Sequence, residues 1–416
     1  MNNPILISGA GPVGLVLALL LYKQGREVEI FEAVKEPAPL GVGINLLPHS
    51  VCVLHNLDLE SKLDQIAIRT EALHYYNRFG QKIWDEPRGL PAGYDYPQYS
   101  IHRGHFQMML LEEVRHRLGE EHVHMDHSLI SWQEENDHIS VTFTSASGKP
   151  KSVNGCALIA AEGINSSVRK ILYPEEGKPI YGGRILWRGT SLADPFLGGK
   201  TMFMAGHQDL KFVAYPISGV DNNNKVLLNW IAEKSVPDLH AEVQDWNKQV
   251  DTDKFSDAFS DWNFSWVDIP NIIASANKVY EFPLSDRDPL PKWAFGRLTL
   301  IGDAAHPMYP IGSNGASQGI LDAEKLAIEL GKNQSLFDTF SNYENERRPA
   351  TASIVLSNRK NGPEQVMQLA HERAPEGFIN IDQVISRTEL EDIAAMYKQT
   401  AGFKVDAVNA NSSRDF

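Results

Sequence analysis

The opening of the chain constrains its fold more than any other stretch. A short apolar run ends in the glycines Gly9, Gly11 and Gly14, and an apolar helical run, a second short apolar run and Glu32 follow. This order predicts a strand, a tight turn, a helix and a parallel strand. In such a unit the helix N-terminus binds a pyrophosphate, and the acid about 20 residues on binds ribose hydroxyls. The opening therefore predicts a dinucleotide site, against the alternative of a glycine-rich turn in an ordinary α/β protein.

Composition narrows the classes of partner. The 416 residues include 39 basic and 53 acidic side chains, a formal net charge of -14, which argues against nucleic acid or an anionic membrane. Cys52 and Cys156 lie far apart with no histidine cluster beside them, so no metal site is expected. The apolar start is broken by glycines and is too short to span a bilayer. We expect a cytoplasmic protein, a monomer or homodimer, whose partner is a small molecule.

Between the two ends the pattern is mixed. Residues 73–84 are predicted to form a strand pair, residues 106–118 a helix, and residues 123–153 short antiparallel strands. A buried strand over 157–161 ends in Glu162-Gly163 and leads to a helix opened by Ser166. From about 181 to 280 aromatic residues recur on strand-like runs, which is typical of a sheet core and, for a few residues, of a pocket wall.

A second glycine-rich stretch begins at residue 297. It reads as a buried strand that ends at Gly302-Asp303, an irregular loop with prolines, and a helix that starts near Asn314. A helix N-terminus of this kind suits a developing negative charge, such as that of a reduced flavin ring. Asp303 is placed to accept hydrogen bonds from ribityl hydroxyls. Taken alone, the stretch also fits an ordinary strand-to-helix turn.

Together, the opening glycines with Glu32, Glu162-Gly163 with Arg169, and Gly302-Asp303-Ala-Ala-His-Pro resemble the single-component FAD-dependent aromatic hydroxylases, the para-hydroxybenzoate hydroxylase family. The resemblance runs from residue 5 to about 348. Finer motifs at 41–49, 185–189, 307–316 and 362–378 are similar to the phenazine monooxygenases of pyocyanin biosynthesis. One departure is Glu162, where the family usually has aspartate.

The resemblance implies an α/β fold with a Rossmann-like FAD-binding domain, a mixed β-sheet substrate domain and a C-terminal helical extension. The expected boundaries are 1–72, 100–178 and 281–350 for the FAD domain, 73–99 and 179–280 for the substrate domain, and 351–416 for the extension. NADH or NADPH would bind transiently, since only one G-x-G-x-x-G is present. Reduced FAD and O2 would form a C4a-hydroperoxide that hydroxylates an aromatic or N-heteroaromatic, phenazine-like ring, with or without decarboxylation. No catalytic side chain is expected.

The family's cofactor contacts carry over to single positions here. Expected at the cofactor are Gly9, Gly11, Val13 and Gly14 (pyrophosphate), Glu32 and Ala33 (adenosine ribose), Arg103, Leu129 (adenine), Asp303 (ribityl) and Gly312, Ser313, Asn314, Gly315 and Ala316 (flavin ring). The alternatives are a surface arginine for Arg103 and a core residue for Leu129.

Substrate contacts are expected where the flavin loop meets the second sheet. Trp187, Phe212, Tyr215 and Pro310 are candidates for a flat wall, with core packing as the alternative for each. Arg184 or Arg188 would pair with a substrate carboxylate, unless both are surface residues. His49 and His306 are considered as bases, although an activated ring needs none.

Other functions fit the same motifs. One is an FAD-dependent dehydrogenase or reductase, and another is a redox sensor that does not turn over. A third is a tailoring or inactivating monooxygenase that acts on a polycyclic antibiotic.

Overall fold

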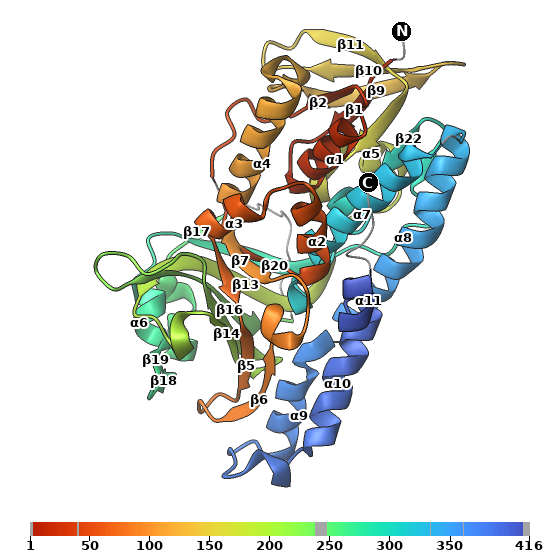
Figure 1. Cartoon of the computed structure of the whole chain (residues 1–416). Coiled ribbons are helices and arrows are strands. Elements are labelled where there is room, and N and C mark those ends of the chain that lie inside the picture. The colour runs from red at the N-terminus through yellow and green to blue at the C-terminus, as the bar shows by residue number, and fades with distance from the viewer. Residues whose placement is uncertain (1–2, 40, 238–247, 333, 361, 411–416) are drawn as a thin grey trace.

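The computed structural model describes residues 3–39, 41–237, 248–332, 334–360 and 362–410. Figure 1 shows two sheet layers stacked along the long axis of the molecule, with long helices along one side. The α/β fold class expected from the sequence is confirmed.

The first layer is built around the predicted strand–helix–strand unit. Its six strands are, in order, β21 (Ala294–Phe295), β22 (Leu298–Leu300), β12 (Ala157–Ala160), β1 (Ile5–Ser8), β2 (Val28–Phe31) and β8 (Val123–His124). All neighbours are parallel except β21 and β22. The carboxyl ends of β1, β12 and β22 therefore meet at one edge, where a doubly wound sheet binds its ligand.

Helices and a small antiparallel sheet pack against the apolar residues of this sheet. The helix α1 (Pro12–Lys23) is buried from Gly14 to Leu21, so it is apolar all round and packs between α4 (Arg103–Leu118) and α7 (Gly315–Gly331). The remaining helices near this layer are α2 (Pro48–Asn56), α3 (Glu60–Ile66), α5 (Ser167–Leu172) and α8 (Leu336–Asn358). Two small sheets complete the layer: β9 (Ser128–Glu134), β10 (Ile139–Thr144) and β11 (Pro150–Gly155), and β3 (Gly43–Leu46), β7 (Gln98–His102) and β4 (Ala67–Thr70).

The second layer is an eight-stranded mixed sheet. Its order is β17 (Gln249–Val250), β20 (Val279–Asp286), β13 (Ile180–Ala193), β16 (Val226–Ser235), β15 (Leu210–Pro216), β14 (Thr201–His207), β5 (Ala72–Tyr76) and β6 (Lys82–Pro87). Only β14 and β5 pair in parallel among these described strands. The predicted strand pair is β5 and β6, and it joins this sheet rather than the first one.

Side chains alternate across the second sheet, as the two-residue period of a strand requires. One face carries an aromatic core that includes Phe203, Phe212 and Trp230, covered by α6 (Ile269–Ala274) and the hairpin of β18 (Asn263–Phe264) and β19 (Val267–Asp268). The other face carries Met202, Val213 and their neighbours. Part of that face packs against the C-terminal helices, and part faces the first layer.

The C-terminal region is helical, as expected, and comprises α9 (Gln365–Arg373), α10 (Arg387–Thr400) and α11 (Val405–Ala410). In Figure 1 these helices run down one side of the eight-stranded sheet. Four of the expected boundaries fall inside elements: 72/73 inside β5, 99/100 inside β7, 280/281 inside β20 and 350/351 inside α8. The division into domains therefore stays a prediction.

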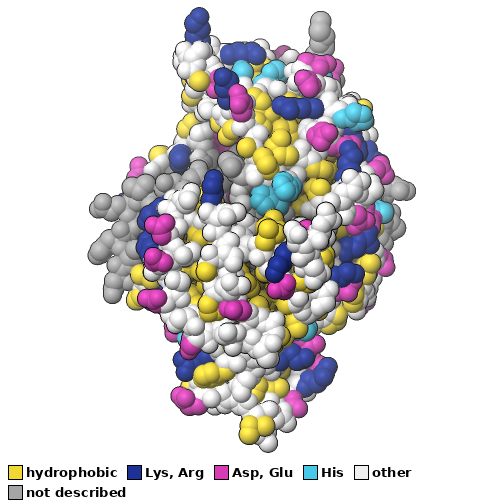
Figure 2. Space-filling model, turned by 90° about the vertical axis from the view of Figure 1, so that its left-hand side faces the viewer, with side chains coloured by type: hydrophobic (Ala, Val, Ile, Leu, Met, Phe, Trp, Pro, Cys, Tyr) yellow, Lys and Arg dark blue, Asp and Glu magenta, His cyan; other side chains and the backbone are white. Residues whose placement is uncertain are grey.

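On the face shown in Figure 2, acidic and basic side chains are interspersed, with apolar side chains between them. Among the described residues, no helix is long and apolar enough to span a bilayer.

Candidate functional site

A cavity of about 850 Å3 lies between the two layers. Its walls include most of the residues named from the sequence: Gly9, Gly11, Val13, Glu32, Ala33, Arg103, Leu129, Asp303, Pro310, Ser313, Asn314, Gly315, Ala316 and Tyr215. Gly14, Gly312, Trp187 and Phe212 do not line it. The cavity therefore brings the two glycine-rich stretches together with the second sheet.

The glycines at the nucleotide end have different tasks. Gly9 has φ +111°, and a Cβ there would lie 2.5 Å from the Ala161 carbonyl oxygen. A Cβ on Gly14 would lie 2.2 Å from the Gly9 carbonyl oxygen, so packing requires glycine there, and Gly14 does not line the cavity. Gly11 has no such neighbour within 4 Å and faces the cavity. Its open side, beside the N-terminus of α1, fits a pyrophosphate.

Glu32 closes this end of the cavity. Its carboxylate accepts hydrogen bonds from the backbone N–H groups of Ala10 (2.7 Å) and Val34 (2.9 Å). The two bonds hold the side chain at the tip of β2, where it lines the cavity. This is the position from which an acid binds ribose hydroxyls.

Glu162, the departure from the family pattern, has a structural explanation. Its carboxylate accepts from the hydroxyls of Ser8 (3.2 Å), Ser166 (2.5 Å) and Ser167 (2.6 Å), and from the N–H of Val168 (3.1 Å). It thereby ties β1 to the first turn of α5. A carboxylate at a helix N-terminus is also favoured by the helix dipole.

The loop after β22 rests on a buried charge network. The Asp322 carboxylate accepts from the N–H of Gly302 (3.1 Å) and pairs with His306 Nε2 and Arg347 Nε (2.7 Å for the arginine). Burial raises the pKa of Asp322, but His306 and Arg347 outweigh burial, and the pKa lies below its usual value. His306 is thus held as a support of the loop and does not line the cavity.

Two more groups near the loop titrate outside their usual ranges. Asp303 lines the cavity, and burial raises its pKa against the opposing charges of His306 and Arg103. Burial and Arg347 lower the pKa of His49 to about 3, so this histidine is neutral at neutral pH. It stacks on Phe403 and does not line the cavity, so neither histidine is placed as a base.

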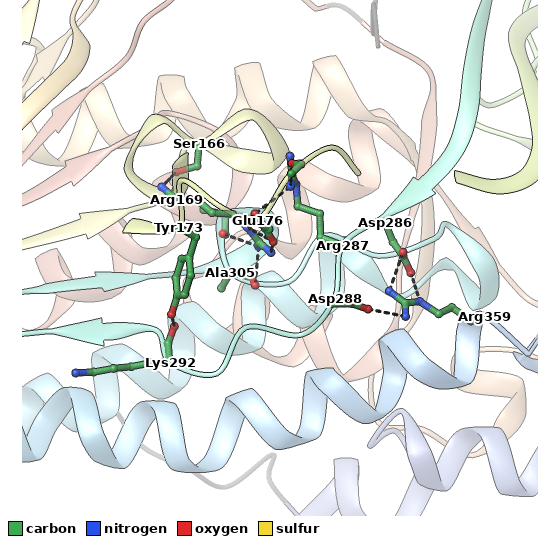
Figure 3. A network of polar contacts seen from close by, with 12 residues as sticks. Ser166, Arg169, Tyr173, Glu176, Asp286, Arg287, Asp288, Lys292, Ala305 and Arg359 are labelled. Atoms are coloured by element: carbon green, nitrogen blue, oxygen red, sulfur yellow. Dashed lines mark hydrogen bonds and ion pairs between the residues drawn. The ribbon is translucent and has the colours of Figure 1, made fainter. Parts of the chain in front are cut away.

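Arg169 fastens the same loop from the other side (Figure 3). It is 2% exposed, and its Nη1 donates to the carbonyl oxygens of Ala304 (3.0 Å) and Ala305 (2.9 Å). Its other nitrogens bind Glu176, which also pairs with Arg287 at 2.9 Å. The Glu162-Gly163 segment and the Gly302-Asp303 loop are therefore locked to each other, which explains why the two motifs occur together.

The far end of the cavity is formed by one face of the second sheet. The lining side chains are Leu186 and Arg188 on β13, Met202 and Met204 on β14, Lys211, Val213 and Tyr215 on β15, and Ile231 and Glu233 on β16. In each strand they are two residues apart, so they share a face.

This alternation corrects two of the substrate candidates. Trp187 lies between Leu186 and Arg188 and so points to the opposite face, where it stacks on Phe255 and its Nε1 donates to Glu281 (3.0 Å). Phe212 is fully buried near Phe203 and Trp230. Both belong to the aromatic core, whereas Tyr215 and Pro310 line the cavity.

Gly312, expected at the flavin ring, does not line the cavity. It has φ +69°, and a Cβ there would lie 1.9 Å from the Tyr397 hydroxyl of α10. The glycine allows α10 to pack closely against the loop that precedes α7. Sequence reasoning named Arg188 but missed Lys211, Glu233 and Glu364. Lys211 is four residues from Tyr215 and Glu233 two from Ile231, so each shares a strand face with a residue that lines the cavity. No local pattern in the sequence marks Glu364.

Comparison with known proteins identifies a matching family and several similar proteins. A family described as "FAD binding domain" matches residues 2–357. The chain belongs to this family. It is 40% identical over 369 residues to the phenazine 1,6-dicarboxylic acid hydroxylase PhzS of Lysobacter antibioticus, covering 86% of this chain and 89% of that protein. It is 28% identical to the 3-hydroxybenzoate 6-hydroxylase 1 of Aquipseudomonas alcaligenes, covering 86% and 88%.

A solved structure shares the fold. Klebsiella pneumoniae HpxO complexed with FAD and uric acid superposes with a TM-score of 0.70 at 21% identity, covering 98% of this chain and 95% of the other. The chain is thus an FAD-dependent monooxygenase of the aromatic-hydroxylase type, with FAD as cofactor and NADH or NADPH as reductant.

Proposed function

We propose that the chain hydroxylates a carboxylated N-heteroaromatic compound of the phenazine type with NAD(P)H and O2, with or without loss of the carboxylate. The observation that carries the proposal is the cavity that joins the dinucleotide glycines to an apolar sheet face bearing Arg188. FAD supplies the oxygen chemistry when it is bound. The residues of the chain bind FAD and the substrate, orient the substrate ring, and shield the site from water.

Arg188 supports a carboxylate on the substrate. Its Nη2 donates to the Gly43 carbonyl oxygen (3.0 Å), its side chain hydrogen-bonds with Tyr215, and its buried Nε has no hydrogen-bond partner. Within the described ranges no carboxylate forms an ion pair with it. Burial lowers the pKa of Arg188, and the charge has no acid to balance it. A substrate carboxylate would supply that balance.

The walls around Arg188 suit flat rings. Leu186, Met202, Met204, Val213 and Ile231 present apolar surface from four neighbouring strands. Methionine side chains adapt to ring edges and faces, and an apolar pocket with few polar groups is typical of a small-molecule site. The same walls exclude water from the ring under attack.

The cofactor contacts extend this proposal. Gly11 and Val13 are assigned to the pyrophosphate, Glu32 to the adenosine ribose, and Asp303 to the ribityl chain, with Ser313 to Ala316 donating backbone N–H groups to the flavin ring. These residues all line the cavity. The N-terminus of α7 is at Gly315, and its dipole favours negative charge on the ring.

The name of the 40%-identical relative supports a phenazine ring and a carboxylate. We infer in addition a cytoplasmic enzyme, monomeric or homodimeric, without a nucleic-acid partner. The excess of acidic over basic residues supports the last point. Light scattering of the FAD-loaded protein tests the oligomeric state.

The test of function is NADH and NADPH oxidation by the FAD-loaded protein against phenazine carboxylates, hydroxybenzoates and hydroxypyridines, with product masses. A product about 16 mass units heavier, or one hydroxylated with loss of carboxylate, is expected from a phenazine carboxylate. Stimulated oxidation without an oxygenated product would instead indicate a reductase. If phenazines do not stimulate oxidation and another ring compound is hydroxylated, the proposed substrate class is wrong and that compound's class takes its place.

A further inference from the structure

The C-terminal region reaches the substrate end of the cavity. The family match ends at residue 357, and Glu364 lies beyond it, at the end of the turn Gly362–Glu364 that precedes α9. Glu364 is 7% exposed and lines the cavity. The region outside the family match therefore contributes a charged side chain to the site.

Glu364 is part of a buried ion network. The Lys211 ammonium pairs with Glu364 and, at 3.0 Å, with Glu233, and Glu233 pairs with Arg184 at 2.8 Å. Lys211 and Glu233 are each 3% exposed. The network comes from β13, β15, β16 and the C-terminal turn, and its two cations balance its two carboxylates.

This balance leaves a defined hydrogen-bonding capacity. An ammonium has three N–H donors. One donates to the Glu364 carboxylate, and the Glu233 carboxylate lies 3.0 Å from the ammonium as an ion-pair partner. Lys211 also lines the cavity, so its remaining donor is available to a ligand atom. Burial lowers the pKa of Lys211, but Glu233 and Glu364 outweigh burial and hold the pKa above its usual value. The donor is therefore charged at neutral pH.

The two cations that line this end of the cavity thus differ. Arg188 has no acid partner within the described residues, whereas Lys211 is already neutralised by two. A ligand carboxylate beside Lys211 would meet Glu233 and Glu364 at short range, and like charges in a buried site are strongly unfavourable. A ring nitrogen or carbonyl oxygen there would accept the free N–H without that repulsion.

We propose that Glu364, acting on Lys211 together with Glu233, makes this enzyme select a substrate with one carboxylate, held by Arg188, and an uncharged acceptor opposite it. The inference rests on the proposed function and narrows its substrate class to monocarboxylated N-heteroaromatics. It assigns Glu364 as a specificity-determining residue that rejects a second carboxylate.

The experiment compares phenazine-1-carboxylate with phenazine-1,6-dicarboxylate. Dissociation constants come from the flavin absorbance change, and kcat/KM from turnover, for the FAD-loaded wild type, Glu364→Gln and the matched control Glu376→Gln. Glu376 is an exposed acid in the same region. The wild type should prefer the monocarboxylate, and Glu364→Gln should shift the preference toward the dicarboxylate by roughly tenfold or more. The control should leave the preference unchanged.

Three results would overturn the inference, and they differ in what else they affect. A wild type that binds the dicarboxylate more tightly overturns it without any variant. An unchanged preference in a Glu364→Gln protein that keeps its FAD and melting temperature overturns it and leaves the hydroxylase function intact. Binding of neither compound overturns the inference and the proposed phenazine class together. Binding with the expected preference but no hydroxylation removes the proposed function and supports the selectivity.

Discussion

The two ends of the cavity are built from different kinds of sequence information. At the nucleotide end, one contiguous motif places Gly9 and Gly11 in the turn before α1 and Gly14 in the first turn of that helix, and Glu32 directly follows β2. At the substrate end, Arg188, Lys211 and Glu364 come from two strands and a distant turn. The first end depends on backbone shape, which tolerates little change, and the second on side chains, which can be exchanged to alter specificity.

The largest expected effect tests the backbone side of this comparison. In Gly14→Val the new side chain would start from a Cβ 2.2 Å from the Gly9 carbonyl oxygen, in the middle of the buried strand–helix contact. We expect no soluble FAD-containing protein, as measured by yield and flavin absorbance.

Gly11→Ala is the matched variant. Its Cβ meets no protein atom within 4 Å and its φ of -72° suits alanine, so the protein should fold and bind FAD more weakly. Circular dichroism of the FAD-free protein tests folding, and titration of the same protein with FAD tests cofactor affinity, so the two measurements separate a folding defect from a binding defect. If Gly14→Val folds and binds FAD normally, the packing role assigned to Gly14 is wrong.

The second prediction concerns the charge network beneath the loop that follows β22. Asp322→Asn leaves His306 and Arg347 buried without their shared carboxylate, and loss of one partner of a buried pair costs about 3–5 kcal/mol. The free energy of unfolding in urea should fall by that order, and FAD should be released more easily.

The pH dependence of this effect has a definite sign. Because the folded state lowers the pKa of Asp322, its contribution is present above the unfolded-state pKa of about 4 and is lost as pH falls below it. Wild type and variant should therefore converge in acid. Asp392→Asn, at an exposed position on α10, should have no effect; an equal loss in both variants would contradict the network.

The third prediction addresses the substrate end. Arg188→Gln removes the cation proposed to bind the carboxylate and should raise the dissociation constant of phenazine-1-carboxylate about 10- to 100-fold, the range expected for a hydrogen bond to a charged group. FAD affinity should change far less than substrate affinity, because Arg188 is assigned to the substrate carboxylate and not to FAD. Arg188→Lys should recover part of the binding. An equal loss of FAD and substrate would place Arg188 at the cofactor instead.

The same comparison explains what the sequence could predict. The strand–helix–strand unit and the Gly302-Asp303 loop follow from local periodicity and glycine spacing, and the structure has both where the pattern predicts them. Trp187 and Phe212 failed as substrate candidates because residue type cannot tell which face of a strand points to the cavity. Counting in steps of two along the strand from Tyr215 would have placed Lys211 on the cavity face and Phe212 on the opposite face, in the aromatic core.

Glu364 shows a different limit. Its neighbours in sequence form an ordinary turn and helix, and its partner Lys211 is 153 positions away. The pairing arises because α9 packs across the face of the second sheet, where Val366, Met367 and Ala370 contact the strands. The Glu364 carboxylate reaches the cavity only through this tertiary packing, and residue spacing within a single sequence does not predict such a long-range contact.

The smallest expected effect tests how firmly that region is attached. His207 of β14 stacks on His371 of α9 with ring centroids 3.9 Å apart, and the N–H of Gln208 donates to Gln368 of α9 at 3.1 Å. Burial and the charge of His371 lower the pKa of His207 to about 4, with Asp209 opposing and Arg78 reinforcing the shift.

Because the folded state lowers the pKa of His207, this histidine is protonated in the unfolded chain but not in the folded chain at pH values between the two pKa values. The contribution of His207 is therefore complete above the unfolded-state pKa of about 6.5 and declines as pH falls toward 4. In His207→Gln the melting temperature should fall less between pH 7 and pH 5 than in the wild type, while His116→Gln, at an exposed position on α4, should follow the wild type. Identical pH profiles for all three proteins would contradict the lowered pKa of His207. A flatter profile accompanied by a pH-independent preference for the monocarboxylate would show that the attachment of α9 and the selectivity of Glu364 are separate properties of the same region.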